Sequence, residues 1–170
     1  MKLAITGKGG VGKTTLASTL ARLYADEGRP VLAADVDPDA NLGLALGMSQ
    51  EEVDSIVPIS KMRTLVEERT GANEANKFFK LNPYVSDIPE KYAHEVNGVK
   101  RVRVVANKVR DERDEAYVRS VIPAEDFLGC IHYNPEIMDA DRNGKSPYDF
   151  SRTAMEEIRN IKAILDRDEK

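Results

Sequence analysis

Apolar residues recur in short runs and in a helical stripe along the first 35 positions of the chain. The run at residues 3–6 ends at Gly7 and predicts a buried strand. Residues 14–26 place apolar side chains at helical spacing, and Gly28 follows as a stop signal, which predicts a helix. A second apolar run at residues 31–34 predicts another strand. Strand, loop, helix and strand in this order form the βαβ pattern of a parallel sheet.

The middle of the chain is more polar. Ser49 precedes two glutamates and predicts a helix start, and Ser60 opens a second short helix that closes near Gly71. Residues 72–98 contain Asn-Pro, Ile-Pro and Asn-Gly turn signals, so this stretch predicts an irregular connection or insertion rather than a separate domain.

Two more strands are predicted at residues 102–106 and 127–131, with a charged helix at 112–121 between them. Residues 151–165 carry one apolar stripe and mixed charges, which predicts a helix packed on the core rather than a membrane-targeting helix. The whole pattern predicts one α/β domain over residues 1–170, with a mostly parallel sheet flanked by helices on both faces.

Composition adds a few limits. The 170 residues are 41% apolar and 32% charged, typical of a globular protein, and the net charge of −4 does not favour nucleic-acid or membrane partners. Cys130 is the only cysteine, so no internal disulfide is possible and a reducing compartment is expected. The apolar run after Met1 is too short for a signal peptide, which favours a cytoplasmic location.

The strongest chemical signal is the glycine-rich segment GKGGVGKT at residues 7–14, which fits the pattern G-x-x-x-x-G-K-[ST] between a predicted strand and a predicted helix. Its glycines let consecutive N–H groups point at phosphate oxygens, together with the positive end of the helix. Lys13 would place its ammonium group on the phosphates, and the Thr14 hydroxyl would ligate Mg²⁺. The positions expected to bind the nucleotide here are Gly9, Gly10, Val11, Gly12, Lys13, Thr14 and Thr15.

Lys8 narrows the choice among families of phosphate-binding proteins. The segment GKGGVGKTT resembles the deviant Walker A motif of the P-loop ATPases that include MinD, ParA and the nitrogenase iron protein. That resemblance implies a P-loop NTPase fold, ATP or ADP as ligand, and a homodimer in which Lys8 reaches the partner's phosphates. Outside this motif, a solvated loop lysine would be the simpler interpretation of Lys8.

Acidic residues cluster after the second predicted strand, at Asp35, Asp37 and Asp39. Ligands bind at the carboxyl ends of strands in open α/β sheets, so one carboxylate could orient a water molecule and another could hold Mg²⁺ through a water ligand. The segment DVDPDAN resembles the family's first switch, which implies that Asp37 positions the attacking water and that Asp35 supports the Mg²⁺ site. A polar turn around Pro38 is the alternative.

Asn107 and Lys108 follow the third predicted strand. A guanine-specific N-K-x-D pocket needs an aspartate where this chain has Arg110. An asparagine amide can pair with the N6 and N7 edge of adenine, and in the family an asparagine at this strand end contacts the base. We therefore expect ATP rather than GTP, with Asn107 as the base-contacting residue and Lys108 as a further nucleotide-binding position.

Further stretches resemble one branch of the family, the CooC-type ATPases that assist nickel insertion into carbon monoxide dehydrogenase. They are MKLAITG at 1–7, DPDANL at 37–42, LNP at 81–83, NKVRD at 107–111 and FLG at 127–129. Two family features are absent, namely a second switch after an apolar strand and the Cys-x-Cys motif, so no nickel site is identified and Cys130 is expected to be a core residue. Both would fall near residues 98–101, where we favour a missing stretch over a divergent relative that has lost its switching parts.

The leading hypothesis is therefore an ATP-hydrolysing accessory protein that dimerises with nucleotide and assists a client metalloenzyme. A positioning ATPase of the MinD or ParA kind is one alternative, and a nucleotide-binding module without turnover is another. If the sequence is complete, hydrolysis is in doubt, because no second switch is recognised.

Overall fold

A computed structural model describes residues 1–36, 41–58, 101–143 and 145–169, together with positions 61, 62, 64, 67 and 68. The chain divides into two compact units. The first unit comprises Met1–Met48 and Arg101–Lys170, and the second comprises Ser49–Lys100. All elements discussed below belong to the first unit, except α3.

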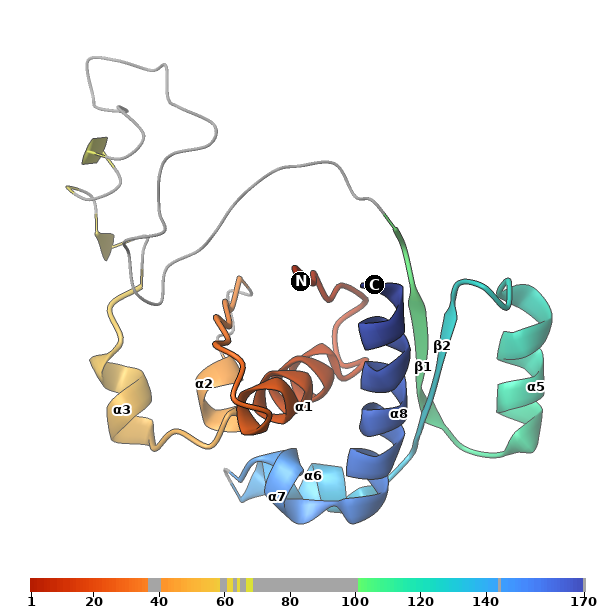
Figure 1. The fold of residues 1–170 in the computed structure, drawn as a ribbon. Coiled ribbons are helices and arrows are strands. Elements are labelled where there is room, and N and C mark those ends of the chain that lie inside the picture. Colours follow the sequence, from red (N-terminus) through yellow and green to blue (C-terminus); the bar gives the residue numbers. More distant parts are fainter. Residues whose placement is uncertain are drawn as a thin grey trace. The chain divides into compact units, whose positions relative to one another are not determined.

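A parallel pair of strands, β1 (Val104–Val109) and β2 (Phe127–His132), forms the sheet of the first unit. Helix α5 (Glu112–Val121) connects them and begins at Asp111, whose carboxylate accepts hydrogen bonds from the backbone N–H groups of Arg113 and Asp114, both at 3.0 Å. Figure 1 shows α5 on one side of the pair and α8 (Arg152–Asp168) on the other. These elements confirm the predicted α/β class with helices on both faces of a parallel sheet.

The core lies around α8, which packs against β2 and against α1 (Lys13–Asp26). Its central side chains come from β2 and α8, where Ile131, Ile158 and Ile161 keep 1% or less of their surface exposed. Full burial of such a side chain contributes about 1.5–3 kcal/mol to the free energy of unfolding. The apolar stripe predicted for residues 151–165 therefore packs on the core, as expected from its spacing.

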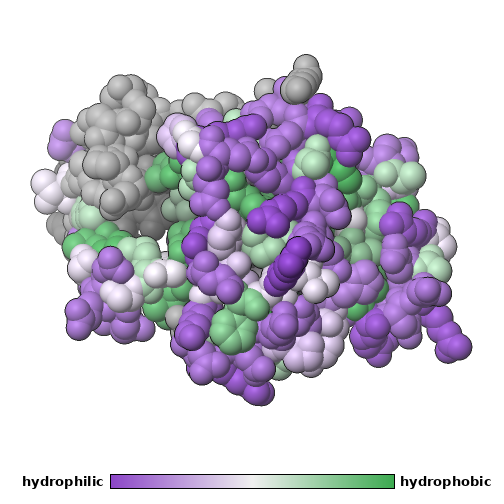
Figure 2. Space-filling view, turned by 60° about the horizontal axis from the view of Figure 1, so that its bottom comes forward, coloured by the Kyte–Doolittle hydropathy of each residue, from purple (hydrophilic) through white to green (hydrophobic). Residues whose placement is uncertain are grey.

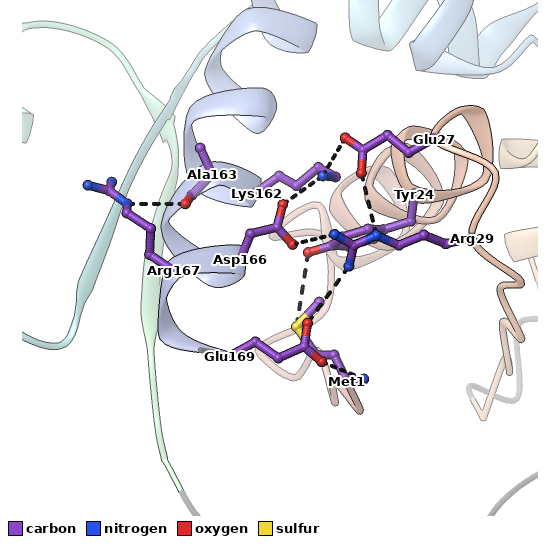
Figure 3. A network of polar contacts seen from close by, with 9 residues as sticks. All are labelled: Met1, Tyr24, Glu27, Arg29, Lys162, Ala163, Asp166, Arg167 and Glu169. Atoms are coloured by element: carbon purple, nitrogen blue, oxygen red, sulfur yellow. Dashed lines mark hydrogen bonds and ion pairs between the residues drawn. The ribbon is translucent and has the colours of Figure 1, made fainter.

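Charged residues connect the C-terminal ends of α1 and α8, as Figure 3 shows. The buried Lys162 donates to Glu27 at 2.7 Å and to Asp166 at 2.8 Å, and its ammonium lies 4.3 Å from the centre of the Tyr24 ring. Burial, with the nearby Asp166 carboxylate, raises the pKa of the Tyr24 hydroxyl. The network fixes the two helices of the core relative to each other at the end remote from the glycine-rich loop.

Three short helices complete the first unit: α2 (Leu42–Ala45), α6 (Pro135–Arg142) and α7 (Pro147–Phe150). None was predicted from the sequence. In the second unit, α3 (Gln50–Ser55) begins as predicted, because Ser49 and Glu52 form a reciprocal capping box.

Two predicted strands are absent from the structure. Residues 3–6 and 31–34 form no strand, and Leu3, Val31 and Leu32 keep 47%, 42% and 53% of their surface exposed. A parallel strand is stabilised by ladder hydrogen bonds to a neighbouring strand, and no other described segment pairs with these two. The prediction of strands at 3–6 and 31–34 is therefore wrong for this structure, although Ile5 does pack against the core.

Several other predictions fall outside the described residues. These are most of the helix predicted between Ser60 and Gly71, the connection at 72–98 and residues 98–100 of the junction at 98–101. Among the helices that the structure does describe, none is long and apolar enough to cross a membrane.

Candidate functional site

The glycine-rich loop leads directly into α1. Gly10 and Gly12 have left-handed φ angles of 75° and 89°, which side-chain-bearing residues rarely adopt. Gly12 is the N-cap of α1 and offers no side-chain acceptor, so no cap side chain occupies the N–H groups of the first helical turn. An exposed loop before an uncapped helix N-terminus is a geometry that suits an anionic group such as phosphate.

Two lysines border this loop. The Lys13 ammonium lies 3.5 Å from the carbonyl oxygen of Lys8, so its side chain folds back along the loop rather than into the core. Lys8 itself is exposed. Thr14 and Thr15 are half-buried in the first turn of α1, beside the same N–H groups. The loop residues singled out in the sequence therefore lie together around one helix end.

The carboxyl end of β1 holds the loop in place. The Asn107 amide nitrogen donates to the Val11 carbonyl at 2.8 Å, and the Lys108 ammonium donates to the Gly10 carbonyl at 2.7 Å. Lys108 has a left-handed φ of 60°, within an irregularity of the strand between Asn107 and Val109. This unusual conformation for a lysine occurs next to the loop, where strained backbone often serves a site.

Asn107 also restricts what can stand at Gly12. A Cβ atom added to Gly12 would lie 2.2 Å from the Asn107 amide nitrogen, which is far inside any allowed contact. The role predicted for Asn107, contact with a nucleotide base, stays a prediction. In the structure its side chain bonds to the loop backbone, a function that the sequence did not indicate.

Arg110, at the position where a guanine-specific pocket has an aspartate, turns toward α5. Its guanidinium makes two hydrogen bonds to the Asp114 carboxylate, at 2.7 and 3.0 Å, and its side chain does not line the cavity beside the loop. These bonds, together with the bond from the Arg110 N–H, lower the pKa of the Asp114 carboxyl to about 2. The preference for ATP over GTP stays a prediction.

We expect Arg110→Gln to raise the pKa of Asp114 from about 2 toward the ordinary value of about 3.9, but not fully to it, because the backbone N–H of residue 110 still donates to the carboxylate. Because the folded-state pKa lies below the unfolded value, the pair stabilises the fold at neutral pH, and this contribution is lost as the pH falls from about 4 to about 2. An NMR titration of the Asp114 carboxyl measures the shift, with Arg113→Gln as the control. An unchanged pKa in Arg110→Gln would contradict the assignment.

Of the acidic residues predicted to serve the site, the structure describes Asp35. Its carboxylate accepts a hydrogen bond from the Leu42 N–H at 3.0 Å and so bonds to the first residue of α2. Asp37 and Asp39, which were expected after the strand end, lie outside the described residues. Asp35 thus links the segment before residues 37–40 to the helix that follows them.

A small cavity of about 40 Å³ lies beside the loop. It is bordered by Gly12, Thr15, Asn107 and Lys108, and by five residues from the end of β2 and from α6 that the sequence did not single out: His132, Tyr133, Asn134, Ile137 and Met138. Tyr133 and Met138 are 51% and 42% exposed, and the Tyr133 hydroxyl donates to the Met138 sulfur at 3.4 Å. A volume of about 40 Å³ accommodates water-sized molecules only.

Helix α6 had a recognisable start signal that could have indicated this wall of the cavity. The side-chain oxygen Oδ1 of Asn134 accepts from the Glu136 N–H at 2.9 Å, and Pro135 is the first helical residue, an arrangement typical of helix N-termini. The Asn134 amide also donates to the Ser151 hydroxyl at 2.6 Å, next to α8. His132 is fixed by Glu157 of α8 through its backbone N–H at 3.0 Å and its Nδ1 at 2.6 Å.

No cluster of three or more metal-ligating side chains occurs among the described residues. Cys130 is half-buried in β2, where the sequence predicted a buried core residue. Burial, and to a smaller degree Glu115, raises the pKa of its thiol, which favours the protonated form over the thiolate that binds metals.

The parallel sheet, the loop at its edge and the comparison with known families agree on the class of protein. Residues 2–148 match the CobQ/CobB/MinD/ParA nucleotide binding domain, and the chain belongs to this family. The carbon monoxide dehydrogenase accessory protein CooC of Rhodospirillum rubrum is 52% identical over 101 residues, which are 59% of this chain and 38% of that protein.

Two further relatives extend the comparison. An uncharacterised ATP-binding protein of Methanocaldococcus jannaschii is 46% identical over 101 residues, 58% of this chain and 38% of that protein. The chromosome partitioning protein ParA of Myxococcus xanthus is 48% identical over 46 residues, 27% of this chain and 16% of that protein. The matches to CooC and to the archaeal protein thus span little more than a third of either relative. They confirm the resemblance to CooC-type and MinD/ParA-type ATP-binding proteins.

Proposed function

We propose that the chain binds ATP at residues 7–15 and hydrolyses it as part of an accessory protein that assists a client metalloenzyme. The observation that carries the proposal is the loop geometry: an uncapped α1 N-terminus beneath a loop that Asn107 and Lys108 hold by its carbonyl groups. These two bonds use C=O groups of the loop, so they do not occupy the N–H groups that would bind a phosphate chain. The Val11 N–H, which donates to the Lys8 carbonyl at 3.4 Å, would exchange this long bond for one to a phosphate oxygen.

The loop would bind the nucleotide through hydrogen bonds and through charge. The N–H groups of residues 9–13 and the start of α1 bind the phosphate oxygens, and Lys13 balances their negative charge. The Thr14 hydroxyl would ligate Mg²⁺, with Asp35 in support, and the ion would neutralise charge on the β- and γ-phosphates. Asp37 would orient the attacking water, and Asn107 and Lys108 would border the base.

The accessory role rests on similarity to CooC, whose name states that it assists carbon monoxide dehydrogenase. We propose a nucleotide-dependent homodimer in which Lys8 supplies its ammonium to the partner's phosphates, in the manner of an arginine finger. The exposed position of Lys8 on the loop supports this, because a side chain that acts on a second copy must lie at the surface. Nickel as the inserted metal is part of the same proposal.

Lys8→Ala tests the dimer. We expect the variant to bind Mg·ATP with an affinity within about threefold of the unmodified chain. The phosphates of the ATP bound in the same subunit would still be held by the loop N–H groups and by Lys13. ATP-dependent dimerisation should be lost, since two charges per dimer are removed from a shared site. Calorimetry measures the binding, and light scattering with Mg·ATP measures the dimer.

Lys145→Ala serves as the control and should dimerise normally. It removes an exposed lysine far along the chain from the glycine-rich loop at residues 7–15. A Lys8→Ala dimer of unchanged mass would overturn the proposed role of Lys8 in the partner's site. Phosphate release from the unmodified chain, measured on the same samples, distinguishes an ATPase from a module that binds ATP without turnover.

A further inference from the structure

A second and larger pocket lies on a different part of the first unit, between α7 and the first two turns of α8. It has a volume of about 300 Å³, and we call it the α7–α8 pocket. Tyr148 and Phe150 of α7 line it, with Arg152, Met155 and Arg159 of α8. These three α8 residues are spaced by three and four positions, so they lie on one face of the helix.

The free charge in this pocket is positive. Arg159 is exposed and forms no hydrogen bond or ion pair among the described residues. Arg152 is 92% exposed and meets Glu156 at 3.3 Å, a contact that water competes with easily. The carboxylate that lines the pocket, Asp149, is already bound at 2.5 Å by Arg22 of α1.

This charge stands out because the chain as a whole is acidic, with a net charge of −4. Arg152 and Arg159 lie on one helix face about two turns apart and have no strong internal partner, so they attract carboxylates and repel basic segments. In Figure 2, in which the end with α6 and α7 comes forward, hydrophilic residues surround small hydrophobic areas.

The remainder of the pocket is apolar and held in place. Met155 is 5% exposed and forms part of the core, whereas Phe150 is 38% exposed and leaves a ring surface available for contact. The Tyr148 ring is fixed by its hydroxyl bond to Asp26 and by the Arg22 guanidinium, which lies 4.1 Å from the ring centre. Arginine and aromatic side chains around an apolar floor are typical of sites that anchor a peptide side chain.

We propose that the α7–α8 pocket receives an acidic segment of a partner protein. An aromatic or aliphatic side chain of that segment packs against Phe150 and Met155, and its flanking carboxylates bind Arg152 and Arg159. The site is separate from the glycine-rich loop, and the proposal does not depend on ATP binding.

The test uses fluorescein-labelled peptides and the full chain, with fluorescence anisotropy as the measurement. The acidic probe Glu-Glu-Phe-Glu-Glu is expected to bind saturably in 50 mM salt and more weakly in 500 mM salt, because exposed charges are screened. The probes Lys-Lys-Phe-Lys-Lys and Glu-Glu-Gly-Glu-Glu should bind at least tenfold more weakly, the first by charge repulsion and the second by loss of the ring.

Arg159→Gln should raise the Kd of the acidic probe roughly tenfold, because it removes one charge-assisted contact between the pocket and the peptide. Arg167→Gln, an arginine of the same helix that does not line the pocket, is the matched control and should leave the Kd unchanged. Both arginines are exposed, so circular dichroism should show an intact fold in each variant. Absence of saturable binding of the acidic probe, equal affinity for the glycine probe, or an unchanged Kd in Arg159→Gln would overturn the proposal.

Discussion

Replacing Lys13 with alanine is expected to abolish measurable binding of Mg·ATP while the fold is retained. In the structure the Lys13 ammonium has one long contact, 3.5 Å to the Lys8 carbonyl, so its removal breaks no strong internal interaction. Against a bound triphosphate the same ammonium would make charge-assisted hydrogen bonds, each worth about 1.5–3 kcal/mol. Loss of two such bonds weakens binding by roughly two to four orders of magnitude.

Isothermal calorimetry with Mg·ATP measures this loss, and thermal unfolding without nucleotide measures the fold. We expect no binding heat and a midpoint within about 2 °C of the unmodified chain. Lys8→Ala is a matched control, because it removes the same charge from the same loop but should retain binding. Tight binding of Mg·ATP by Lys13→Ala would remove the basis of the proposed function.

The helices and strands that could be predicted share a clear local signal. Helix α5 was predicted with the bounds that the structure shows, because its charged sequence lies between two short apolar runs, which form β1 and β2. Helix α8 was predicted from its apolar stripe, which the core confirms. The short helices α6 and α7 were missed because each has too few residues to show a helical period.

At residues 3–6 and 31–34 the error is the opposite one, because strands were predicted there and the structure forms none. Their apolar sequences are typical of buried strands, but a strand needs a neighbour as well as a suitable sequence. In the structure neither segment has one among the described residues. Pattern alone therefore overstated the size of the sheet.

The candidate site was predictable where its residues are consecutive and not where they are distant. Residues 7–14 carry their signal in one motif, so the loop and its lysines were found directly. The bonds from Asn107 to Val11 and from Lys108 to Gly10 join positions 96 and 98 residues apart. No periodicity or spacing encodes such contacts, because they depend on how the ends of β1 and α1 pack.

That packing makes Gly12 the most constrained position of the loop. We expect Gly12→Ala to lose both stability and ATP binding, for two separate reasons. The φ angle of 89° is left-handed, which costs an alanine about 1–2 kcal/mol. The new Cβ would also lie 2.2 Å from the Asn107 amide nitrogen, so Asn107 would have to give up its bond to Val11. Together these effects should lower the free energy of unfolding by roughly 3 kcal/mol.

Two neighbouring glycines separate these causes. Gly10 has a left-handed φ of 75° but open space around an added Cβ, so Gly10→Ala should show only the backbone cost. Gly9 has open space and no left-handed φ, so Gly9→Ala should be nearly neutral for stability. Urea unfolding measures the three free energies, and calorimetry measures ATP binding. If Gly12→Ala were no less stable than Gly10→Ala, the close packing of Asn107 on the loop would not be a constraint, and the proposal that β1 holds the phosphate loop in its binding shape would fail.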